Sequence, residues 1–395
     1  MKQCARMQQV QTPIIPIVGQ WIRQHPGTIS LGQGIVAYGP PPPARERLDG
    51  FFDQLGVHRY HPVNGIPPLR ERLGQKLHQE NGIVLSEDGQ SDGYGLCVSA
   101  GANMAFMNTV MAITDPGDQI LVLRPFYFNH EMAIQMAGCT AVVVDTDASY
   151  QPVLARIADS ITPRTRAVVT ISPNNPTGAV YPEATLRAIN TLCRRRGIFH
   201  IHDEAYEYFT FDGVAHFSPG SIAGSEDYTI SLFSLSKAYG FAGWRIGYMV
   251  FPQRLEESIK KVQDTLLICP PVVSQVAALG ALEAGRDYCQ QNQPSIQESR
   301  ELVWEGLQQI PDLCTVPRPQ GAFYYLPKIK TSRSGMEVAE CLVREFKVAV
   351  IPGEAFGLKQ GCYLRISYGA LDTATAGEGV ARLVCGLKQL VGDQG

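Results

Sequence analysis

The sequence lacks the cysteine pairs that form disulfides or bind zinc. Its ten cysteines occur singly, mostly among apolar neighbours, and none belongs to a CxxC pair. This pattern predicts reduced thiols in a cytosolic protein, with neither a disulfide framework nor a metal site. The cysteines are Cys4, Cys97, Cys139, Cys193, Cys269, Cys289, Cys314, Cys341, Cys362 and Cys385.

Long apolar segments are also missing. No run of 18 apolar residues occurs, and the N-terminal stretch TPIIPIVGQW is short and interrupted by prolines. A membrane span needs about 20 predominantly apolar residues, and a signal peptide needs an apolar centre. We therefore expect a cytoplasmic protein that does not bind a membrane.

Neither sign of charge dominates the chain. It has 34 Lys and Arg against 37 Asp and Glu, a formal net charge of −3, and its longest basic cluster is Arg194 to Arg196. This balance argues against nucleic acid as a partner. Two phosphate-binding patterns are absent, GxxxxGKS/T and GxGxxG after a strand, which argues against a kinase or a dehydrogenase.

What the sequence does have is a regular alternation of segment types. Between residues 94 and 250, short and almost wholly apolar runs alternate with longer amphipathic ones. This pattern is typical of a mainly parallel sheet covered by helices on both faces. An α+β pattern follows residue 285, and we expect a helix over about 253–284 to connect the two parts. With 395 residues there is room for two lobes. We predict an N-terminal segment that joins the small domain, a large domain and a small C-terminal domain, at residues 1–45, 46–284 and 285–395.

Small or polar residues follow several of the apolar runs, where an open parallel sheet binds its ligand. SAGAN precedes a helix whose N–H groups can bind an anion, and PNNPTG follows RAVVTIS. Asp203 follows IFHIH, and Lys237 in SLSK follows YTISLF. Each feature alone also has a structural explanation, such as tight packing, a helix cap or a surface lysine.

One ligand accounts for these residues together. It needs a phosphate, a protonatable ring nitrogen, a ring oxygen and a carbonyl carbon, which are the groups of pyridoxal 5'-phosphate held covalently by a lysine. The phosphate would meet the SAGAN helix with Ser234, Ser236 and Arg245, and the ring nitrogen would meet Asp203. The ring oxygen would meet Asn175 and Tyr206, and the carbonyl carbon would meet Lys237.

The order of SAGAN, PNNPTG, DEAYEYF, SLSKAYGFAGWRIGY and YLRISYG resembles the class I/II aminotransferases of the fold-type-I pyridoxal-phosphate superfamily, near the kynurenine, aromatic and aspartate branch. The resemblance extends from Leu31 to Tyr368. It implies an α/β large domain with a mainly parallel, seven-stranded sheet between helices. It also implies a smaller α+β domain, built from the N-terminal segment and the C-terminal part, and a homodimer with shared active sites.

The resemblance implies roles for individual residues. Lys237 would be the Schiff-base lysine and the proton carrier, Asp203 would pair with the ring nitrogen, and Tyr206 would bind the ring oxygen. The substrate would be bound by Arg365, Asn175 and the backbone of Gly34. The other cofactor contacts would come from Gly101, Ala102, Asn103, Tyr127, Asn175, Ser234, Ser236 and Arg245, and from Tyr60 of the neighbouring subunit.

The N-terminal loop departs from the family. Many relatives have a G-x-P-D-F run where this chain reads GIVAYG, residues 34–39, so side-chain specificity is the property in doubt. The neutral Asn103, the arginine-free LLICPPVVSQ and the loop residues Ile35, Val36 and Tyr38 predict a neutral, apolar or aromatic amino acid as donor. A 2-oxo acid would be the second substrate.

Two alternatives accompany the prediction of a ping-pong aminotransferase. The same groups could serve a C–S lyase or another β-eliminating or decarboxylating enzyme, because small pocket differences decide which bond of the substrate breaks. A non-catalytic sensor built on this fold is the alternative from another class. Such regulators carry an added DNA-binding domain, for which this chain has neither the room nor a basic patch.

Overall fold

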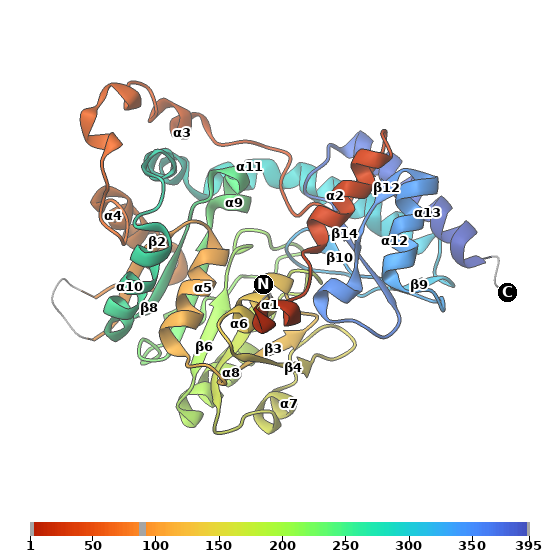
Figure 1. Ribbon diagram of the computed structural model, residues 1–395. Helices are drawn as coiled ribbons and strands as arrows, with labels where there is room; N and C mark the ends of the chain where they lie inside the picture. The colour runs from red at the N-terminus through yellow and green to blue at the C-terminus, as the bar shows by residue number, and fades with distance from the viewer. Residues whose placement is uncertain (1–3, 87–91, 393–395) are drawn as a thin grey trace.

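A seven-stranded sheet forms the centre of the large lobe in the computed structural model, which describes residues 4–86 and 92–392 (Figure 1). The strand order is β2-β8-β7-β6-β5-β3-β4, and β8 alone runs antiparallel to its two neighbours. The mainly parallel sheet predicted from the apolar runs is thus confirmed. The strands are β2 (Tyr94–Ser99), β3 (Gln119–Arg124), β4 (Thr140–Asp145), β5 (Thr165–Ile171), β6 (Phe199–Asp203), β7 (Thr229–Ser234) and β8 (Gly247–Pro252).

Helices cover both faces of this sheet, which explains why its strands are apolar throughout. On one face Ile120 and Val122 pack with side chains of α5 (Ala102–Ile113) and α6 (Phe128–Met136). On the other face Leu121 packs with side chains of α8 (Glu183–Arg196). The further helices of this lobe are α4 (Pro67–Lys76), η3 (Leu77–Asn81), α7 (Leu154–Asp159), η4 (Pro219–Ser221), α9 (Leu235–Ala238), η5 (Ala242–Trp244), η6 (Gln253–Leu255) and α10 (Glu256–Leu267).

The small lobe is a short antiparallel sheet covered by two helices. Its central strand is β14 (Cys362–Ser367), which pairs with β10, β11 and β13. The N-terminal segment joins this lobe, because β1 (Ile29–Ser30) pairs in parallel with β12 (Val348–Ala349). The domain boundaries at residues 45 and 284 remain predictions. The other elements here are α2 (Ile14–Gln24), β9 (Cys314–Thr315), β10 (Tyr324–Tyr325), β11 (Lys328–Ile329), α12 (Gly335–Phe346), β13 (Ile351–Pro352), η7 (Gly353–Phe356) and α13 (Thr373–Gly392), whereas the short α1 (Ala5–Gln9) packs against α6 of the large lobe.

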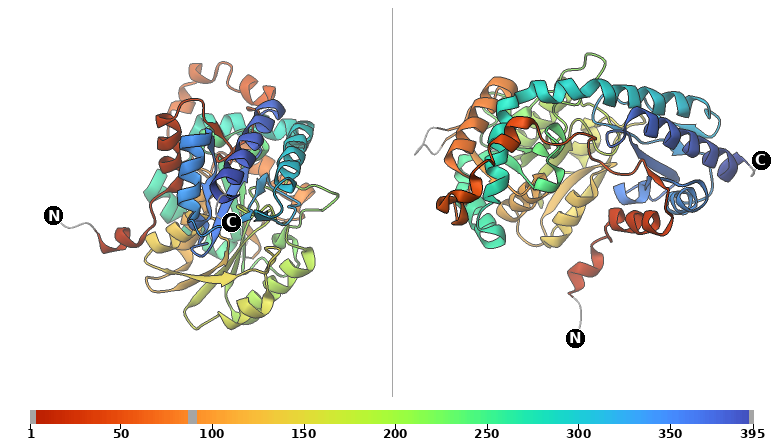
Figure 2. Two further views of the ribbon diagram at one scale, coloured as in Figure 1. Left: turned by 90° about the vertical axis from the view of Figure 1, so that its right-hand side faces the viewer. Right: turned by 90° about the horizontal axis from the view of Figure 1, so that it is seen from above.

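The predicted connecting helix over 253–284 is wrong. The helix α10 ends at Leu267, and Ile268 has a φ of 68°, outside the helical region. Two prolines follow, Pro270 and Pro271, which lack the N–H that a continuing helix needs. A new helix, α11 (Val272–Gln308), then runs from the large lobe into the small one, with a kink at Gly285 (Figure 2, cyan).

An arm made of α3 (Pro42–Glu46), η1 (Phe51–Asp53) and η2 (Leu55–His58) stands at the outer side of the large lobe (Figure 1). Three large apolar or aromatic side chains on it face solvent in the single chain: Phe52 is 70% exposed, Leu55 81% and Tyr60 79%. Within residues 4–86 and 92–392, no helix is both long and apolar enough to cross a membrane.

Candidate active site

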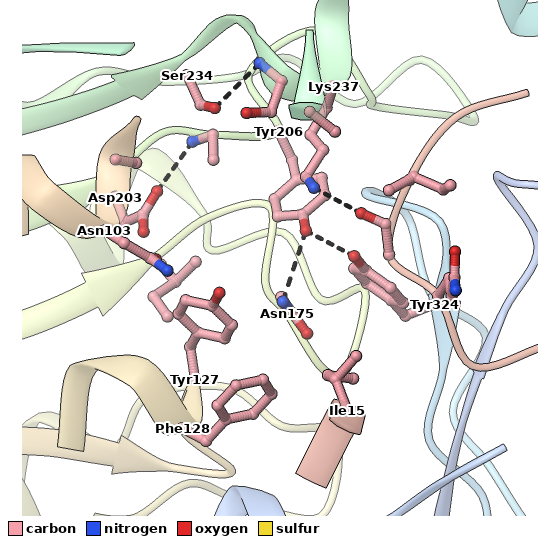
Figure 3. A pocket seen from close by; sticks show the side chains of 18 of the residues that line it. Ile15, Asn103, Tyr127, Phe128, Asn175, Asp203, Tyr206, Ser234, Lys237 and Tyr324 are labelled. Atoms are coloured by element: carbon pink, nitrogen blue, oxygen red, sulfur yellow. Dashed lines mark hydrogen bonds between the residues drawn. The ribbon is translucent and has the colours of Figure 1, made fainter. Parts of the chain in front are cut away.

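A cavity of about 570 Å³ opens at the carboxyl ends of β5, β6 and β7, beside the small lobe (Figure 3). It brings together most of the residues singled out from the sequence, from seven separate parts of the chain. The predicted residues that line it are Gly34, Ala102, Asn103, Tyr127, Asn175, Asp203, Tyr206, Ser234, Ser236, Lys237, Arg245 and Arg365.

Two predicted residues do not line the cavity. Gly101 does not line it; its φ of 83° favours glycine, and a Cβ there would displace the guanidinium of Arg245, which does line the cavity. Tyr60 lies on the exposed arm, outside the cavity of its own chain. Its contact with a neighbouring subunit remains a prediction.

The loop after Gly34 contributes less to the cavity than the sequence suggested. Ile35 lines it, as expected. Val36 is instead buried in the hydrophobic core, and the Tyr38 hydroxyl donates to the backbone carbonyls of Lys237 and Ala238. These two residues therefore do not shape the cavity wall, and Tyr38 instead supports α9.

Lys237 lies on the one-turn helix α9, which the Ser234 side chain caps by accepting the N–H of Ser236 at 3.1 Å. Its Nζ donates to the carbonyl oxygen of Gly34 at 2.5 Å and forms no ion pair with any described residue. Burial, together with the nearby Arg365 and Arg245, lowers the pKa of Lys237 to about 8. A substantial fraction of the amine is therefore neutral near physiological pH, the form that attacks a carbonyl carbon.

Asp203, at the end of β6, has a close polar partner at each carboxylate oxygen. Its Oδ1 accepts the N–H of Ala205 at 3.0 Å, and its Oδ2 lies 3.2 Å from Nε2 of His130. His130 stacks on Phe106 with ring centroids 4.0 Å apart. His130 was not predicted from the sequence, although it follows Tyr127 by three residues at a helix start, a spacing that places two side chains on one helix face.

A chain of hydrogen bonds crosses the cavity from the small lobe (Figure 3). Arg365, on β14, donates to Oδ1 of Asn175 at 2.8 Å and to the carbonyl of Gly32 at 2.7 Å, while its buried Nε has no partner. Nδ2 of Asn175 lies 3.5 Å from the Tyr206 hydroxyl, which lies 2.6 Å from the Tyr324 hydroxyl. Burial raises the pKa of both tyrosines, that of Tyr324 to about 12, so both remain protonated at neutral pH. Tyr324, too, was not predicted from the sequence.

The sheet register explains why an anion site forms beside Lys237. Ser99, Gly247 and Ser234 are paired neighbours at the ends of β2, β8 and β7. This register brings together the N-terminus of α5, the Ser234 side chain and Arg245. The N–H groups and dipole of a helix N-terminus attract negative charge. The groups around the cavity therefore fit pyridoxal 5'-phosphate: an anion site, a fixed carboxylate, the amide of Asn175, the phenol of Tyr206, and a half-buried lysine that forms no ion pair with any described residue.

One other cluster in the described part of the chain could be considered for a metal ion. Ligand atoms of Glu204, Glu207 and His216 lie within 4.8 Å of one another. Lys76 already lies 2.5 Å from Glu207, and Ser218 and His216 both contact Oε2 of Glu204. The cluster lies outside the cavity, and one oxygen of each carboxylate already has a protein partner.

Comparison with known proteins finds aminotransferases by family model, by sequence and by structure. The family model described as aminotransferase class I and II matches residues 26–383. An aromatic aminotransferase of Arabidopsis thaliana is 33% identical over 388 residues, covering 96% of this chain and 94% of the relative. A probable aspartate/prephenate aminotransferase of Aquifex aeolicus is 35% identical over 344 residues, 85% of each chain. The structure of Thermus thermophilus aspartate aminotransferase with maleate aligns with a TM-score of 0.89 at 31% identity, covering 98% of this chain and 100% of that one.

Proposed function

The chain belongs to the class I and II aminotransferases and is a pyridoxal-phosphate-dependent enzyme, and from this premise we propose how its residues divide the work. The reaction moves an amino group from an amino acid to a 2-oxo acid in two half-reactions. The observation that carries the proposal is a half-buried lysine that forms no ion pair with any described residue, in one cavity with a fixed carboxylate and a buried arginine. Lys237, Asp203 and Arg365 would be the central residues.

The cofactor would be held at both ends of its ring. Asp203 would face the ring nitrogen, and Asn175 and Tyr206 would donate to the ring oxygen. The N-terminus of α5, with Gly101, Ala102 and Asn103, would bind the phosphate together with Ser234, Ser236 and Arg245, and Tyr127 would lie against the ring. When bound, the cofactor supplies a carbonyl carbon for the lysine and a ring that accepts the electron pair left by Cα deprotonation.

The chain's own groups would bind the substrate and move the proton. Arg365 would bind the α-carboxylate, because its planar guanidinium matches a carboxylate and its Nε still has no partner. Lys237 has a pKa of about 8, which leaves part of its amine neutral. Its Nζ would accept the proton from the substrate Cα and then donate it to a different carbon atom. Asn175, which links Arg365 to Tyr206, would keep the carboxylate site and the ring-oxygen site in register.

The lining of the cavity supports a neutral, apolar or aromatic amino acid as the donor. Its charged side chains among the described residues are Asp203, Lys237, Arg245 and Arg365. Once Arg245 is assigned to the phosphate and Arg365 to the α-carboxylate, no cation is left for a second carboxylate. The rest of the lining includes Ile15, Ile35, Phe128, Tyr324 and the neutral Asn103. Glutamate or 2-oxoglutarate would be tolerated as the second partner through Arg365.

The names of the relatives include both aromatic and aspartate/prephenate aminotransferases, so the donor must be measured. The decisive values are kcat/KM for phenylalanine, methionine, leucine, kynurenine and aspartate with one fixed oxo acid. We expect the neutral amino acids to have higher kcat/KM values than aspartate. Among the neutral amino acids the differences should be modest, since one methylene in an apolar pocket changes the binding free energy by only about 1–3 kcal/mol. A tenfold or greater advantage for aspartate would contradict the proposal.

A second copy of this chain is the expected partner. The apolar side chains Phe52 and Leu55 and the ring of Tyr60 are exposed together on the arm, and burying them would require another surface. Tyr60 would then contact the phosphate in the partner subunit. All ten cysteines are unpaired, which supports a reducing compartment, and we place the enzyme in the cytoplasm with neither nucleic acid nor a membrane as partner.

A further inference from the structure

Tyr324 is a small-lobe residue whose hydroxyl reaches into the cofactor cavity. It lies on β10, is completely buried, and lines the cavity from the side opposite the central sheet (Figure 3). Its hydroxyl oxygen lies 2.6 Å from that of Tyr206, the only hydrogen-bond partner that this hydroxyl has within the described residues. Nothing in the mechanism above uses this contact.

Three contacts fix the Tyr324 side chain. The guanidinium carbon of Arg365 lies 4.6 Å from the centre of its ring, and the Tyr206 ring meets it edge-on at 5.6 Å. On the third side, the hydroxyl lies so close to Gly34 that a Cβ at that position would collide with it. The hydroxyl therefore has little freedom to turn away from Tyr206.

The direction of the Tyr206–Tyr324 hydrogen bond can be assigned by counting protons. Each hydroxyl has one proton to donate. Nδ2 of Asn175 points a second donor at the Tyr206 oxygen, at 3.5 Å. If Tyr206 gave its own proton to Tyr324, it would present only lone pairs to the ring oxygen of the cofactor, which is itself an acceptor. The favourable arrangement has Tyr324 donating to Tyr206, and Tyr206 donating to the cofactor.

We propose that Tyr324 is a positioning residue that donates to Tyr206 and so commits the single Tyr206 proton to the ring oxygen of the bound cofactor. The proposal rests on the function assigned to the cavity above. Hydrogen bonds in a chain polarise one another, so the donation from Tyr324 makes Tyr206 a stronger donor. A stronger donor stabilises negative charge on the ring oxygen and lowers the pH at which the bound cofactor loses its proton.

The other titratable and charged groups around the Tyr206 and Tyr324 hydroxyls come from several neighbouring elements. They are Asp203 after β6, Lys237 on α9, Arg245 before β8, Arg365 on β14 and Tyr127 before α6. None of them forms a hydrogen bond with the Tyr324 hydroxyl, so Tyr324→Phe removes the donation to Tyr206 and leaves their own hydrogen bonds in place.

The test is a spectroscopic pH titration of the loaded protein, which needs no turnover. The midpoint of the absorbance change of bound cofactor is measured for wild type, Tyr324→Phe and Tyr325→Phe. The control residue is the next in the strand, is equally buried, and donates to the carbonyl of Arg300 instead, outside the cavity. We expect Tyr324→Phe to raise the midpoint by about 0.5–1 pH unit, the size expected for one hydrogen bond, and Tyr325→Phe to leave it in place.

A double-mutant cycle with Tyr206→Phe shows whether the effect passes through Tyr206. In that background, Tyr324→Phe should no longer move the midpoint, since the group it acts through is gone. An unchanged midpoint in Tyr324→Phe, or an equal shift with and without Tyr206, would overturn the proposal while leaving the cofactor site intact. Wild-type protein that takes up no cofactor at all would overturn the proposed site itself.

Discussion

Nε2 of His130 lies 3.2 Å from Oδ2 of Asp203, and both side chains are more than nine-tenths buried. With the N–H of Ala205 on the other carboxylate oxygen, this contact fixes the carboxylate in one orientation at the end of β6. A buried carboxylate is costly unless its oxygens are satisfied. The pair therefore delivers a fixed negative charge to the cavity, which is what a protonated ring nitrogen needs beside it.

Replacing this charge should affect catalysis more than folding. Asp203→Asn keeps the shape but cannot hold a proton on a ring nitrogen, so we expect kcat to fall by roughly 100-fold or more, a usual scale for a lost electrostatic group in an active site. Its stability in urea should change by less than about 1.5 kcal/mol. Asp145→Asn is the control, since Asp145 also ends a strand of the same sheet, the edge strand β4, but forms an exposed pair with Arg124. Normal turnover in Asp203→Asn together with lost stability would reduce Asp203 to a structural role.

The lowered pKa of Lys237 predicts a reactive amine in the cofactor-free protein. The neutral fraction rises with pH, and for a pKa of about 8 half of the Lys237 amines are neutral at that pH, whereas an ordinary lysine reaches this point near 10.5. Modification by trinitrobenzenesulfonate, followed by peptide mass spectrometry against pH, should show Lys237 reacting with a midpoint near 8. Loss of that signal in Lys237→Ala identifies the amine, and a midpoint near 10.5 would contradict the prediction.

Arg365→Lys tests the carboxylate site. The substitution keeps the charge but loses the planar pair of donors that now reach Asn175 and Gly32. KM should rise roughly 10- to 100-fold for every amino acid and oxo acid alike, because all share the carboxylate. The exposed Arg344→Lys is the matched control. A defect confined to one substrate would reassign Arg365 to side-chain recognition.

Gly34→Ala should damage the site through a single methyl group. A Cβ at residue 34 collides with the Tyr324 hydroxyl, whereas at Gly39, in the same loop, nothing lies within 4 Å. We expect kcat/KM to fall about 10- to 100-fold in Gly34→Ala, since small displacements of positioned groups are costly, and to stay near wild type in Gly39→Ala. Equal effects of the two substitutions would contradict this prediction, because the loss of activity would then come from reduced flexibility of the loop and not from the clash with Tyr324.

Mixed dimers test the role of Tyr60. A Tyr60→Ala chain keeps its own Lys237, and a Lys237→Ala chain keeps its own Tyr60. If Tyr60 serves the partner's cavity, then each mixed dimer of these two inactive or weakened proteins contains one intact cavity. Co-refolding the two variants should therefore restore activity that neither shows alone. Failure to restore activity, with mixed dimers present, would place Tyr60 outside the site.

The sequence was most informative where chemistry follows a buried strand. Asp203 and Lys237 stand directly after apolar runs, so the sheet rule alone predicts that they meet at one edge, and the structure brings both into one cavity. His130 and Tyr324 carry no such signal. His130 lies inside a helix, and Tyr324 and Tyr325 are adjacent on a strand, where alternation predicts that one faces the cavity but not which one.

Loop conformation and helix breaks were harder to predict. GIVAYG has no periodicity that would separate the cavity-lining Ile35 from Val36 in the core or Tyr38 against α9. The break between α10 and α11 was signalled by Pro270 and Pro271, but the amphipathic residues on both sides gave the appearance of one helix. In both places tertiary packing, rather than local sequence, decides the outcome.

The pairing of β1 with β12 also determines when the cavity can exist during synthesis. Ile29 is made early but pairs with Val348, and Arg365 emerges from the ribosome later still. The strands of the large sheet and Lys237 are all synthesised before Val348 and Arg365. Because local and nearby contacts form first, the nascent chain can form the large sheet before β1 pairs with β12. Until then the segment with β1 and Gly34 has no strand to bind. A chain that ends before residue 365 therefore has the lysine and the large sheet but lacks the arginine that completes the cavity.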